Sequence, residues 1–378
     1  MVIKNISLPG SVNEFINIGT RGEVLTNNYS DDLELDFKGA IAFPGLINSH
    51  DHLEFNLFPK LGNKIYEDYV EWGNDIHVKN KEIIDKIRSV PYELRFKWGL
   101  YKNLLCGVTT IAHHGNGKIY NCKGMPDIVN HYNYLHSVRL ERIWKLKLNL
   151  SFNDNPFVVH IGEGTNDKSY DEVIELIKWN LTGRKIIGVH GISMDKKNCS
   201  NFVALVWCPD SNLFLYNKTA DINALKKDTD ILFGSDSALS SDWNIWNHIR
   251  LARSFGYLND KELYDSLSVK AATIWGLHDL GSLDESKRAD IVISNRKSED
   301  AWDDFFNTNP QDILLILKGG RIVFLDKGYE DKYRIINKTD FDLIEINEVR
   351  KYVVKGLKKL KESILHYLPE YKFPFNVF

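Results

Sequence analysis

The sequence lacks the features that mark membrane, secreted and nucleic-acid-binding proteins. No apolar run approaches the roughly 18 residues that cross a membrane, and the N-terminus has no apolar core of signal-peptide length. The 4 cysteines are scattered without a CxxC pair, which favours reduced thiols over a disulfide framework. A net charge of -3 gives no reason to expect nucleic acid or an anionic membrane as a partner. We therefore expect a cytoplasmic globular protein that binds a small molecule.

What the sequence does contain is a repeated alternation of short apolar runs and longer amphipathic ones. The apolar runs span residues 45–50, 107–114, 134–140, 156–162, 185–191, 202–209 and 230–236. The helical patterns span residues 93–106, 170–181, 245–256 and 260–276. This alternation is typical of a parallel sheet with helical crossovers. We expect the α/β class, with a (β/α)8 TIM-like barrel.

Short strand patterns at both ends of the chain predict a second, smaller unit. They indicate a small β-sandwich domain built from both chain ends. An apolar face from Ile344 to Ile364 predicts a helix over residues 341–367. The expected domains are 1–42 (N-terminal part of the β-domain), 43–281 (barrel), 282–330 (C-terminal part of the β-domain) and 331–378 (C-terminal helix and tail).

Two histidines, His50 and His52, flank Asp51 at the end of the first apolar run. Alternate side chains of a strand share a face, so both imidazoles point the same way while Asp51 points elsewhere. This geometry suits two ligands of one metal ion. For an isolated HxH, two ordinary surface or core histidines would be the better interpretation.

Three other apolar runs also end in residues that bind metals. His160 ends PFVVHIG, His190 ends KIIGVHG and Asp236 ends DILFGSD. In a parallel barrel these strand ends meet at one mouth, where such enzymes hold their active sites, so a metal site becomes the favoured interpretation. Glu163 follows His160 between two glycines, and its carboxylate could reach a metal-bound water without being a ligand. The alternative for Glu163 is a solvated loop residue.

Together these motifs resemble the amidohydrolase superfamily, in particular its mononuclear deaminase and chlorohydrolase branch. The resemblance rests on PGLINSHDH, VVHIGEG, VHG, WCPDSNL, FGSDSALSSDWNIW and GSLDESKRADIVI, which occur in the family's order. Each motif alone is modestly specific, and the ordered set is highly specific. The resemblance covers most of the chain.

The resemblance implies one divalent metal per chain, Zn²⁺ or Fe²⁺, bound by His50, His52, His160 and Asp236. It also implies that Glu163 is the general acid/base and that His190 polarises the substrate or steadies an oxyanion. Asp236 would act both as a ligand and as a proton acceptor. No lysine stands where the binuclear relatives keep a carbamylated one, which favours a single metal. Imidazole and carboxylate donors suit zinc or iron(II).

The sequence departs from the family pattern before His160. About 45 residues separate the second strand run from His160, too few for two strand–helix units of roughly 30 residues each. Residues 134–140 fit a third strand, whereas 141–155 read as a helix with a loop. We therefore expect the barrel to be truncated around its third and fourth units, in a region that often contacts substrate in relatives.

Five further residues are candidate substrate contacts: Asn56, Trp72, His113, His114 and Trp243. Trp72 lies in a long aromatic loop, residues 53–90, of the kind that often forms a lid. One of the two adjacent histidines is expected to point into the mouth, with a structural role for both as the alternative. Asn56 could instead cap a loop.

The expected reaction is deamination of an amino-substituted heterocycle by a metal-activated water. Hydrolysis of a cyclic amide or imidate, or of a ring halide as in chlorohydrolases, remains the alternative, because pocket shape sets the leaving group. A non-catalytic scaffold that kept the fold is the third hypothesis. A homodimer is expected only from the general frequency of such assemblies.

Overall fold

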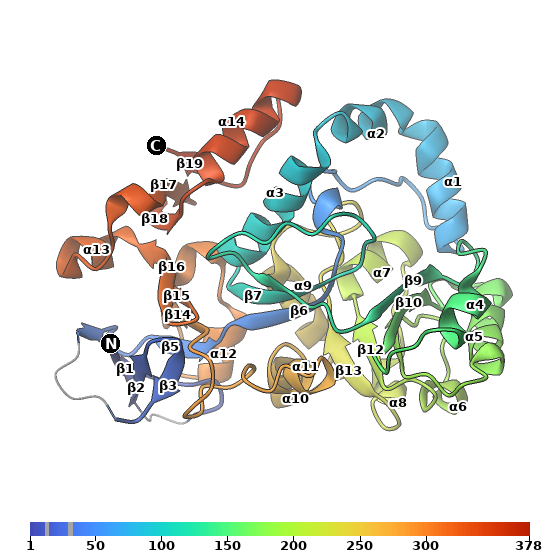
Figure 1. The fold of residues 1–378 in the computed structure, drawn as a ribbon, viewed down its shortest axis with the longest axis horizontal. Coiled ribbons are helices and arrows are strands. Elements are labelled where there is room, and N and C mark those ends of the chain that lie inside the picture. Colours follow the sequence, from blue (N-terminus) through green and yellow to red (C-terminus); the bar gives the residue numbers. More distant parts are fainter. Residues whose placement is uncertain (12–14, 29–32) are drawn as a thin grey trace.

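The computed structural model describes residues 1–11, 15–28 and 33–378. Figure 1 shows two regions: a parallel α/β region that contains β6–β13, and a β-rich region that brings both ends of the chain together. Within the described ranges, no helix combines the length and the apolar character needed to cross a membrane. The α/β class expected from the sequence is confirmed.

The parallel strands form two sheets at the centre of the α/β region. One sheet has the order β13-β12-β11-β10-β9 and the other the order β6-β7-β8. Their bounds are β6 (Leu46–Asp51), β7 (Val108–His113), β8 (Asp127–Ile128), β9 (Asn133–Ser137), β10 (Phe157–Ile161), β11 (Ile186–His190), β12 (Ala204–Trp207) and β13 (Asp230–Phe233). The backbone N–H of Asp236 donates to the carbonyl of His50 at 3.0 Å, which joins the end of β13 to β6. Among the described residues the strands do not form one continuous hydrogen-bonded ring.

The region before β10 is short, as the sequence suggests. Residues 138–156 contain one helix, α4 (Trp144–Asn149), and no strand. β9 pairs directly and in parallel with β10, with Phe157 opposite Asn133. The end of β9 therefore lies beside the end of β10 at the mouth of the sheet.

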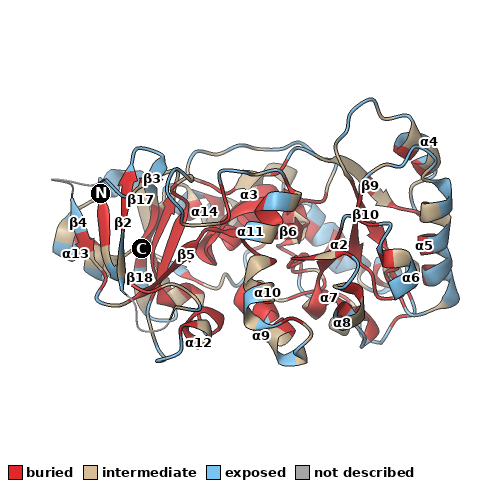
Figure 2. Cartoon of the chain, turned by 90° about the horizontal axis from the view of Figure 1, so that it is seen from below, coloured by how far each residue is buried: buried red, intermediate tan, exposed pale blue. Residues whose placement is uncertain are grey.

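Helices connect these strands and cover the sheets (Figure 1). Their bounds are α3 (Tyr92–Leu105), α5 (Asp167–Trp179), α6 (Lys196–Cys199), α7 (Pro209–Tyr216), α8 (Ile222–Leu225), α9 (Ile245–Phe255), α10 (Asp260–Asp265) and α11 (Val269–Ile274). Side-chain caps fix several starts: Asn166 accepts from the N–H of Ser169 at α5, and Asn244 accepts from Trp246 at α9. Figure 2 shows that the strands are buried while the helices expose one face.

The segment predicted as a long loop, residues 53–90, is largely helical. It contains η1 (Leu53–Phe55), α1 (Tyr69–Lys79) and α2 (Lys81–Arg88). Asp68 begins α1 by accepting from two backbone N–H groups. α1 lacks a strongly apolar stripe, which is why its sequence does not look helical. The segment lies over the strand ends, so its expected position as a cover is observed.

The β-rich region joins the two chain ends. A sheet of order β3-β2-β1-β4 packs beside one of order β19-β17-β18-β16-β15-β14-β5, and one cluster of buried side chains includes residues of both. Their bounds are β1 (Val2–Ile6), β2 (Ile16–Arg21), β3 (Val24–Thr26), β4 (Glu34–Asp36), β5 (Ile41–Pro44), β14 (Ile291–Ser294), β15 (Ile313–Lys318), β16 (Arg321–Asp326), β17 (Phe341–Ile346), β18 (Val349–Val354) and β19 (Asn376–Val377). The helical segments here are α12 (Ala301–Phe306), η2 (Pro310–Asp312), α13 (Lys327–Tyr333), η3 (Lys338–Asp340) and α14 (Leu357–Tyr367). The predicted domain boundaries stay predictions.

The helix predicted over residues 341–367 is wrong for its first half. Residues 341–354 form the hairpin β17–β18, and only α14 is helical. The turn consists of Asn347 and Glu348, whose φ angles of 47° and 67° suit a tight two-residue hairpin. Apolar residues of this hairpin also fit a helical spacing, so the pattern alone does not separate the two structures.

Candidate metal centre and active site

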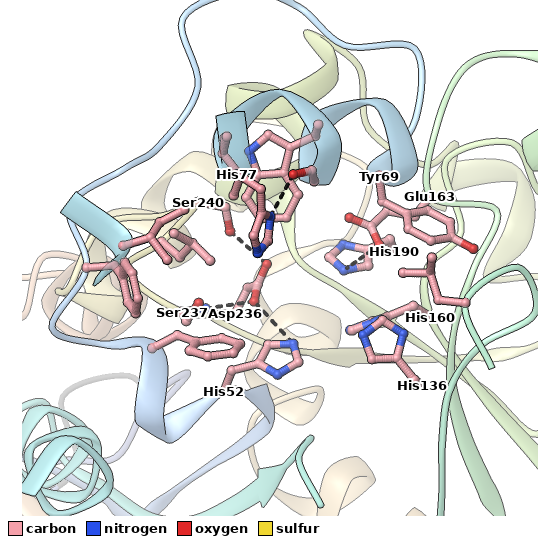
Figure 3. A pocket seen from close by; sticks show the side chains of 18 of the residues that line it. His52, Tyr69, His77, His136, His160, Glu163, His190, Asp236, Ser237 and Ser240 are labelled. Atoms are coloured by element: carbon pink, nitrogen blue, oxygen red, sulfur yellow. Dashed lines mark hydrogen bonds and ion pairs between the residues drawn. The ribbon is translucent and has the colours of Figure 1, made fainter. Parts of the chain in front are cut away.

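The strand ends of the parallel sheets converge on one cavity of about 260 Å³ (Figure 3). It is lined by His52, His160, Glu163, His190 and Asp236, together with residues of α1 and α2. These five polar side chains come from the ends of four different strands. The structure therefore brings the predicted strand-end residues together in one cavity.

Potential metal donors cluster at the floor of this cavity. His50 Nε2 lies 3.2 Å from His160 Nε2 and 3.8 Å from Asp236 Oδ1. His52 Nε2 lies 3.9 Å from the same Asp236 oxygen. Two sets of donor atoms lie within 4.8 Å of one another, His50–His52–Asp236 and His50–His114–His160. His50 belongs to both sets, and the second set contains a histidine that was expected to contact substrate.

The backbone turns sharply where these side chains leave their strands. His190 has φ 72° and Asp236 has φ 55°, a left-handed conformation that is uncommon outside glycine. Gly162, between His160 and Glu163, has φ 58° and allows the turn that brings Glu163 back to the cavity. Such strain is concentrated at functional sites, where surrounding contacts hold it.

Burial makes the imidazoles neutral. It lowers the pKa of His50, His114 and His160 well below the ordinary value, and it also lowers the pKa of His52. Neutral imidazole is the form that binds a metal. For Asp236, burial raises the pKa, but neighbouring histidines and the hydroxyls that donate to it outweigh burial and leave the pKa below its usual range. The site therefore offers neutral nitrogen donors beside one carboxylate.

Glu163 and His190 face each other across the same cavity. Glu163 Oε2 lies 3.7 Å from His190 Nε2, and Glu163 Oε1 accepts from the hydroxyl of Tyr216 at 2.9 Å. Burial raises the pKa of Glu163, which His190 and Tyr216 partly oppose. His190 Nδ1 lies 2.8 Å from Asn212 Oδ1, so Nδ1 donates and Nε2 is directed to the cavity. The pair can exchange a proton with a bound molecule.

Asp51 points away from the cavity, as the strand alternation predicts. Its carboxylate accepts from Lys102 at 3.1 Å, from Asn103 at 2.7 Å and from Asn56 at 2.8 Å, all of them buried. Asn48 donates to Ser235 Oγ at 2.8 Å within the same network. This network ties the end of β6 to α3 and to the segment after β13.

The predicted substrate contacts separate into two groups. Trp72 lines the cavity. Asn56 donates to Asp51 and accepts from the N–H of Ala238, so its amide is engaged within the chain. Trp243 packs against the hydrophobic core and His113 against the ring of Phe96, and neither lines the cavity. His114 is buried behind the metal donors, with its ring centroid 4.4 Å from that of His160.

Sequence reasoning missed several side chains of the cavity. His136 lines it from the end of β9, where burial lowers its pKa to about 4. His136 is the next-to-last residue of β9, as His160 is of β10, but it stands near the start of the apolar run 134–140, so the strand-end argument does not single it out. Ser237 and Ser240 line the cavity after Asp236, and Tyr216 of α7 does not line it but donates to Glu163. Their positions depend on packing between elements distant in sequence, for which the sequence gives no local signal.

One family model matches part of the chain. Residues 152–323 match the model of the amidohydrolase family. This range includes His160, Glu163, His190 and Asp236, and it ends in β16. No curated protein matches the chain in sequence.

Similar solved structures cover nearly the whole chain. A zinc-bound adenosine deaminase from Xanthomonas campestris is 14% identical, with a TM-score of 0.62 over 89% of this chain and 98% of that one. The zinc complex of atrazine chlorohydrolase TrzN from Arthrobacter aurescens is 15% identical, with a TM-score of 0.68 over 97% and 100%. A guanine deaminase from C. acetobutylicum with guanine in its active site is 15% identical, with a TM-score of 0.63 over 85% and 99%. At these identities the similarity establishes a shared fold.

Proposed function

We propose that the protein is a metal-dependent hydrolase of carbon–nitrogen bonds, a proposal that the amidohydrolase family match over residues 152–323 supports. Its proposed reaction is deamination of an amino-substituted heterocycle such as a purine, pyrimidine or pterin-like ring. One observation carries the proposal: potential metal donors and the pair Glu163–His190 open into the same cavity.

The donor set fits one zinc or iron(II) ion. His50, His52, His160 and Asp236 are the proposed ligands, and these side chains offer three neutral nitrogens and one carboxylate oxygen. When bound, the ion supplies a Lewis acid that makes water acidic near neutral pH. Zinc in the adenosine deaminase and in TrzN supports this choice of ion.

Glu163 is proposed to move the protons of the reaction. As a carboxylate it takes a proton from the attacking water, while the water oxygen bonds to the ring carbon that bears the amino group. It then gives that proton to the amino nitrogen, and the carbon–nitrogen bond breaks to release ammonia. The raised pKa of Glu163 suits both steps, because an acid/base group works best when its pKa lies near the operating pH.

His190 is proposed to stabilise the charge that develops during water attack. Its Nε2 is directed to the cavity because Asn212 engages Nδ1, and Glu163 lies 3.7 Å from that Nε2. Because Nδ1 carries the proton that is donated to Asn212, Nε2 donates only from the doubly protonated imidazolium, whose Nε2–H would offer a hydrogen bond to a ring nitrogen or oxygen that gains negative charge. Ser237 and Ser240 line the cavity beside Asp236; Ser240 and Ser211 donate to its Oδ2 at 2.9 and 2.7 Å and hold the carboxylate in place.

The cavity walls favour a flat, largely apolar substrate. Phe55, Phe58, Trp72 and Ile76 line it from the covering segment, and Leu239 lines it from the segment after β13. Aromatic walls stack well on heterocyclic rings. Glu163 and His190 line the cavity from the strand ends, so one edge of a ring would face them, while His77 and Arg88 line it from the covering helices.

The proposal names an amino group as the leaving group, and other leaving groups are a direct alternative. Water attack on a ring carbon would equally displace a halide or an alkylamine, or open a cyclic amide. The fold that this chain shares with TrzN, a chlorohydrolase, supports this alternative. The same floor residues would serve all of these reactions, so only product analysis separates them.

The test is a product screen with protein reconstituted with zinc and, separately, with iron(II). The panel contains aminopurines, aminopyrimidines, aminopterins, chloro- and alkylaminotriazines and cyclic amides. Ammonia release that disappears in Glu163→Gln supports deamination, whereas halide, alkylamine or carboxylate release selects the alternative. A metal-loaded protein that is silent on the whole panel overturns the proposal and favours the scaffold interpretation.

A further inference from the structure

We propose that His114 is an additional ligand of the metal ion, so that the chain offers four imidazoles and one carboxylate to a single site. This inference rests on the proposed metal of the preceding section and adds one residue to its ligand set. His114 was expected to contact substrate or to be structural, and the metal-ligand motifs do not include it.

The first observation is that His114 is buried without any polar partner. Its side chain is 1% exposed, and among the described residues neither Nδ1 nor Nε2 has a hydrogen-bond partner. A buried polar group without a partner costs roughly 1–3 kcal/mol, and native structures rarely leave one. The protein chain therefore supplies no polar partner for this imidazole.

The second observation is where the ring lies. Its centroid is 4.4 Å from that of His160, 5.2 Å from that of His50 and 5.5 Å from that of His52. One nitrogen of each of His50, His114 and His160 lies within 4.8 Å of the others. Three proposed ligands thus surround His114, and one of its nitrogens belongs to the same cluster of donors.

Substrate is a poor candidate for the missing partner. His114 is absent from the lining of the cavity, which His52, His160 and His136 line instead. On its other side the ring packs at 4.7 Å from the ring of Tyr134. A metal ion bound among His50, His52 and His160 is the remaining partner that could reach an imidazole nitrogen there.

The donor geometry also favours a cation between these rings. His114 shares a cluster of donor atoms with His50 and His160, each of which offers one nitrogen. One cation can therefore accept a nitrogen from each of these imidazoles. Five donors exceed the three that a catalytic zinc usually takes from a protein, which favours an ion that accepts a higher coordination number, such as iron(II).

The neighbouring His113 provides a matched control. It is the last residue of β7, directly before His114, and its ring is also buried. Its ring faces Phe96, with centroids 5.2 Å apart, and its Nε2 lies 3.8 Å from Glu54. Because the two residues are adjacent at the end of an extended segment, they point to opposite sides. A general effect of removing a buried histidine from this segment would appear in both variants.

The experiment measures metal affinity by chelator competition and the visible absorption of the Co²⁺-substituted protein. We expect His114→Phe to bind Zn²⁺ and Co²⁺ at least about tenfold more weakly than wild type, since even outer-sphere partners contribute about 10–100-fold. Its Co²⁺ bands should intensify, because d–d bands strengthen as coordination number falls. His113→Phe should keep the wild-type affinity and spectrum.

Unchanged affinity and an unchanged Co²⁺ spectrum in His114→Phe would overturn this inference while leaving the proposed function intact. A wild-type protein that binds neither ion overturns the proposed function itself, and the inference with it. If His114→Phe does not fold, His114→Gln is measured against His113→Gln by the same criteria. Equal losses in the two variants would also reject a specific role for His114.

Discussion

At the scale of single residues, Glu163 is the side chain on which the proposed chemistry depends most. It is buried, it lies beside His190, and burial raises the pKa of its carboxyl group. A substitution that removes the charge of Glu163 and keeps its shape is therefore the most direct test of its role.

We expect Glu163→Gln to lower kcat by at least about 100-fold, because general acid/base catalysis contributes about 10²–10⁴-fold. Metal content should stay at the wild-type level, since Glu163 is not a proposed ligand. Both are measured on the same preparation, by product release and by elemental analysis. A variant with wild-type turnover would remove Glu163 from the mechanism.

Tyr216 offers a test through pH. Its hydroxyl donates to Glu163 and lowers the pKa of that carboxyl group, so Tyr216→Phe should raise the pKa of Glu163. The carboxylate form accepts the proton from water, and the rate falls as pH drops through that pKa. The acid limb of kcat/KM should therefore move to higher pH. An acid limb that stays in place, or moves to lower pH, would show that it does not report Glu163.

At the scale of elements, a buried ion pair joins α3 to the end of β6, next to the proposed metal donors. Lys102 is 1% exposed and pairs with Asp51, the residue between His50 and His52. Lys102 Nζ also lies 3.4 Å from Ser235 Oγ, next to Asp236. One ammonium group thus contacts both segments that present the metal donors.

We expect Lys102→Met to lower the free energy of unfolding by about 3–5 kcal/mol, because it leaves the Asp51 carboxylate buried without its cation. The control is Lys97→Met on the same helix, whose more exposed pair with Glu93 should contribute less than about 1 kcal/mol. Denaturant unfolding of the metal-free proteins measures both. Equal small losses would mean that the buried pair is not a structural support.

The helices α1 and α2 cover the cavity, and Trp72 of α1 is one of the aromatic side chains that line it. Trp72→Ala should raise KM about tenfold with kcat nearly unchanged, because the ring binds substrate and transition state alike. Val78→Ala, on the exposed face of the same helix, should change neither constant. A fall in kcat at constant KM for Trp72→Ala would instead place the ring close to the reacting atoms.

The strands β6 and β7 and the hairpin β17–β18 show which parts of the fold could be predicted from the sequence. Alternation along β6 predicts that His50 and His52 share a direction and that Asp51 opposes them, because a strand repeats every two residues. The same rule separates His113 from His114 but cannot tell which of them faces inward, since that depends on how β7 lies against its neighbours. The hairpin β17–β18 was missed because its apolar residues fit two periodicities.

At the scale of the whole molecule, the proposed metal would join the two parallel sheets, which few hydrogen bonds connect. Its proposed ligands come from β6, from β10 and from the segment after β13. β6 and β13 belong to different sheets. A bound ion should therefore stabilise the packing of these two sheets, since anything that binds only the folded state raises its stability.

Tyr216 and His136 illustrate what only the assembled molecule reveals. Tyr216 reaches Glu163 from a helix more than 50 positions away along the chain, and His136 joins the cavity because β9 pairs directly with β10. Both positions follow from how distant elements pack. The metal-ligand motifs were readable from sequence because each strand end adds its own local signal.

The central claim is that one divalent metal is held at the floor of the cavity, and elemental analysis of the purified protein tests it most directly. Wild type should contain about one zinc or iron per chain, and both His52→Ala and Asp236→Asn should lose it, because each removes one donor of the proposed set. Wild-type protein that stays free of metal after reconstitution with zinc and with iron(II) would contradict the account.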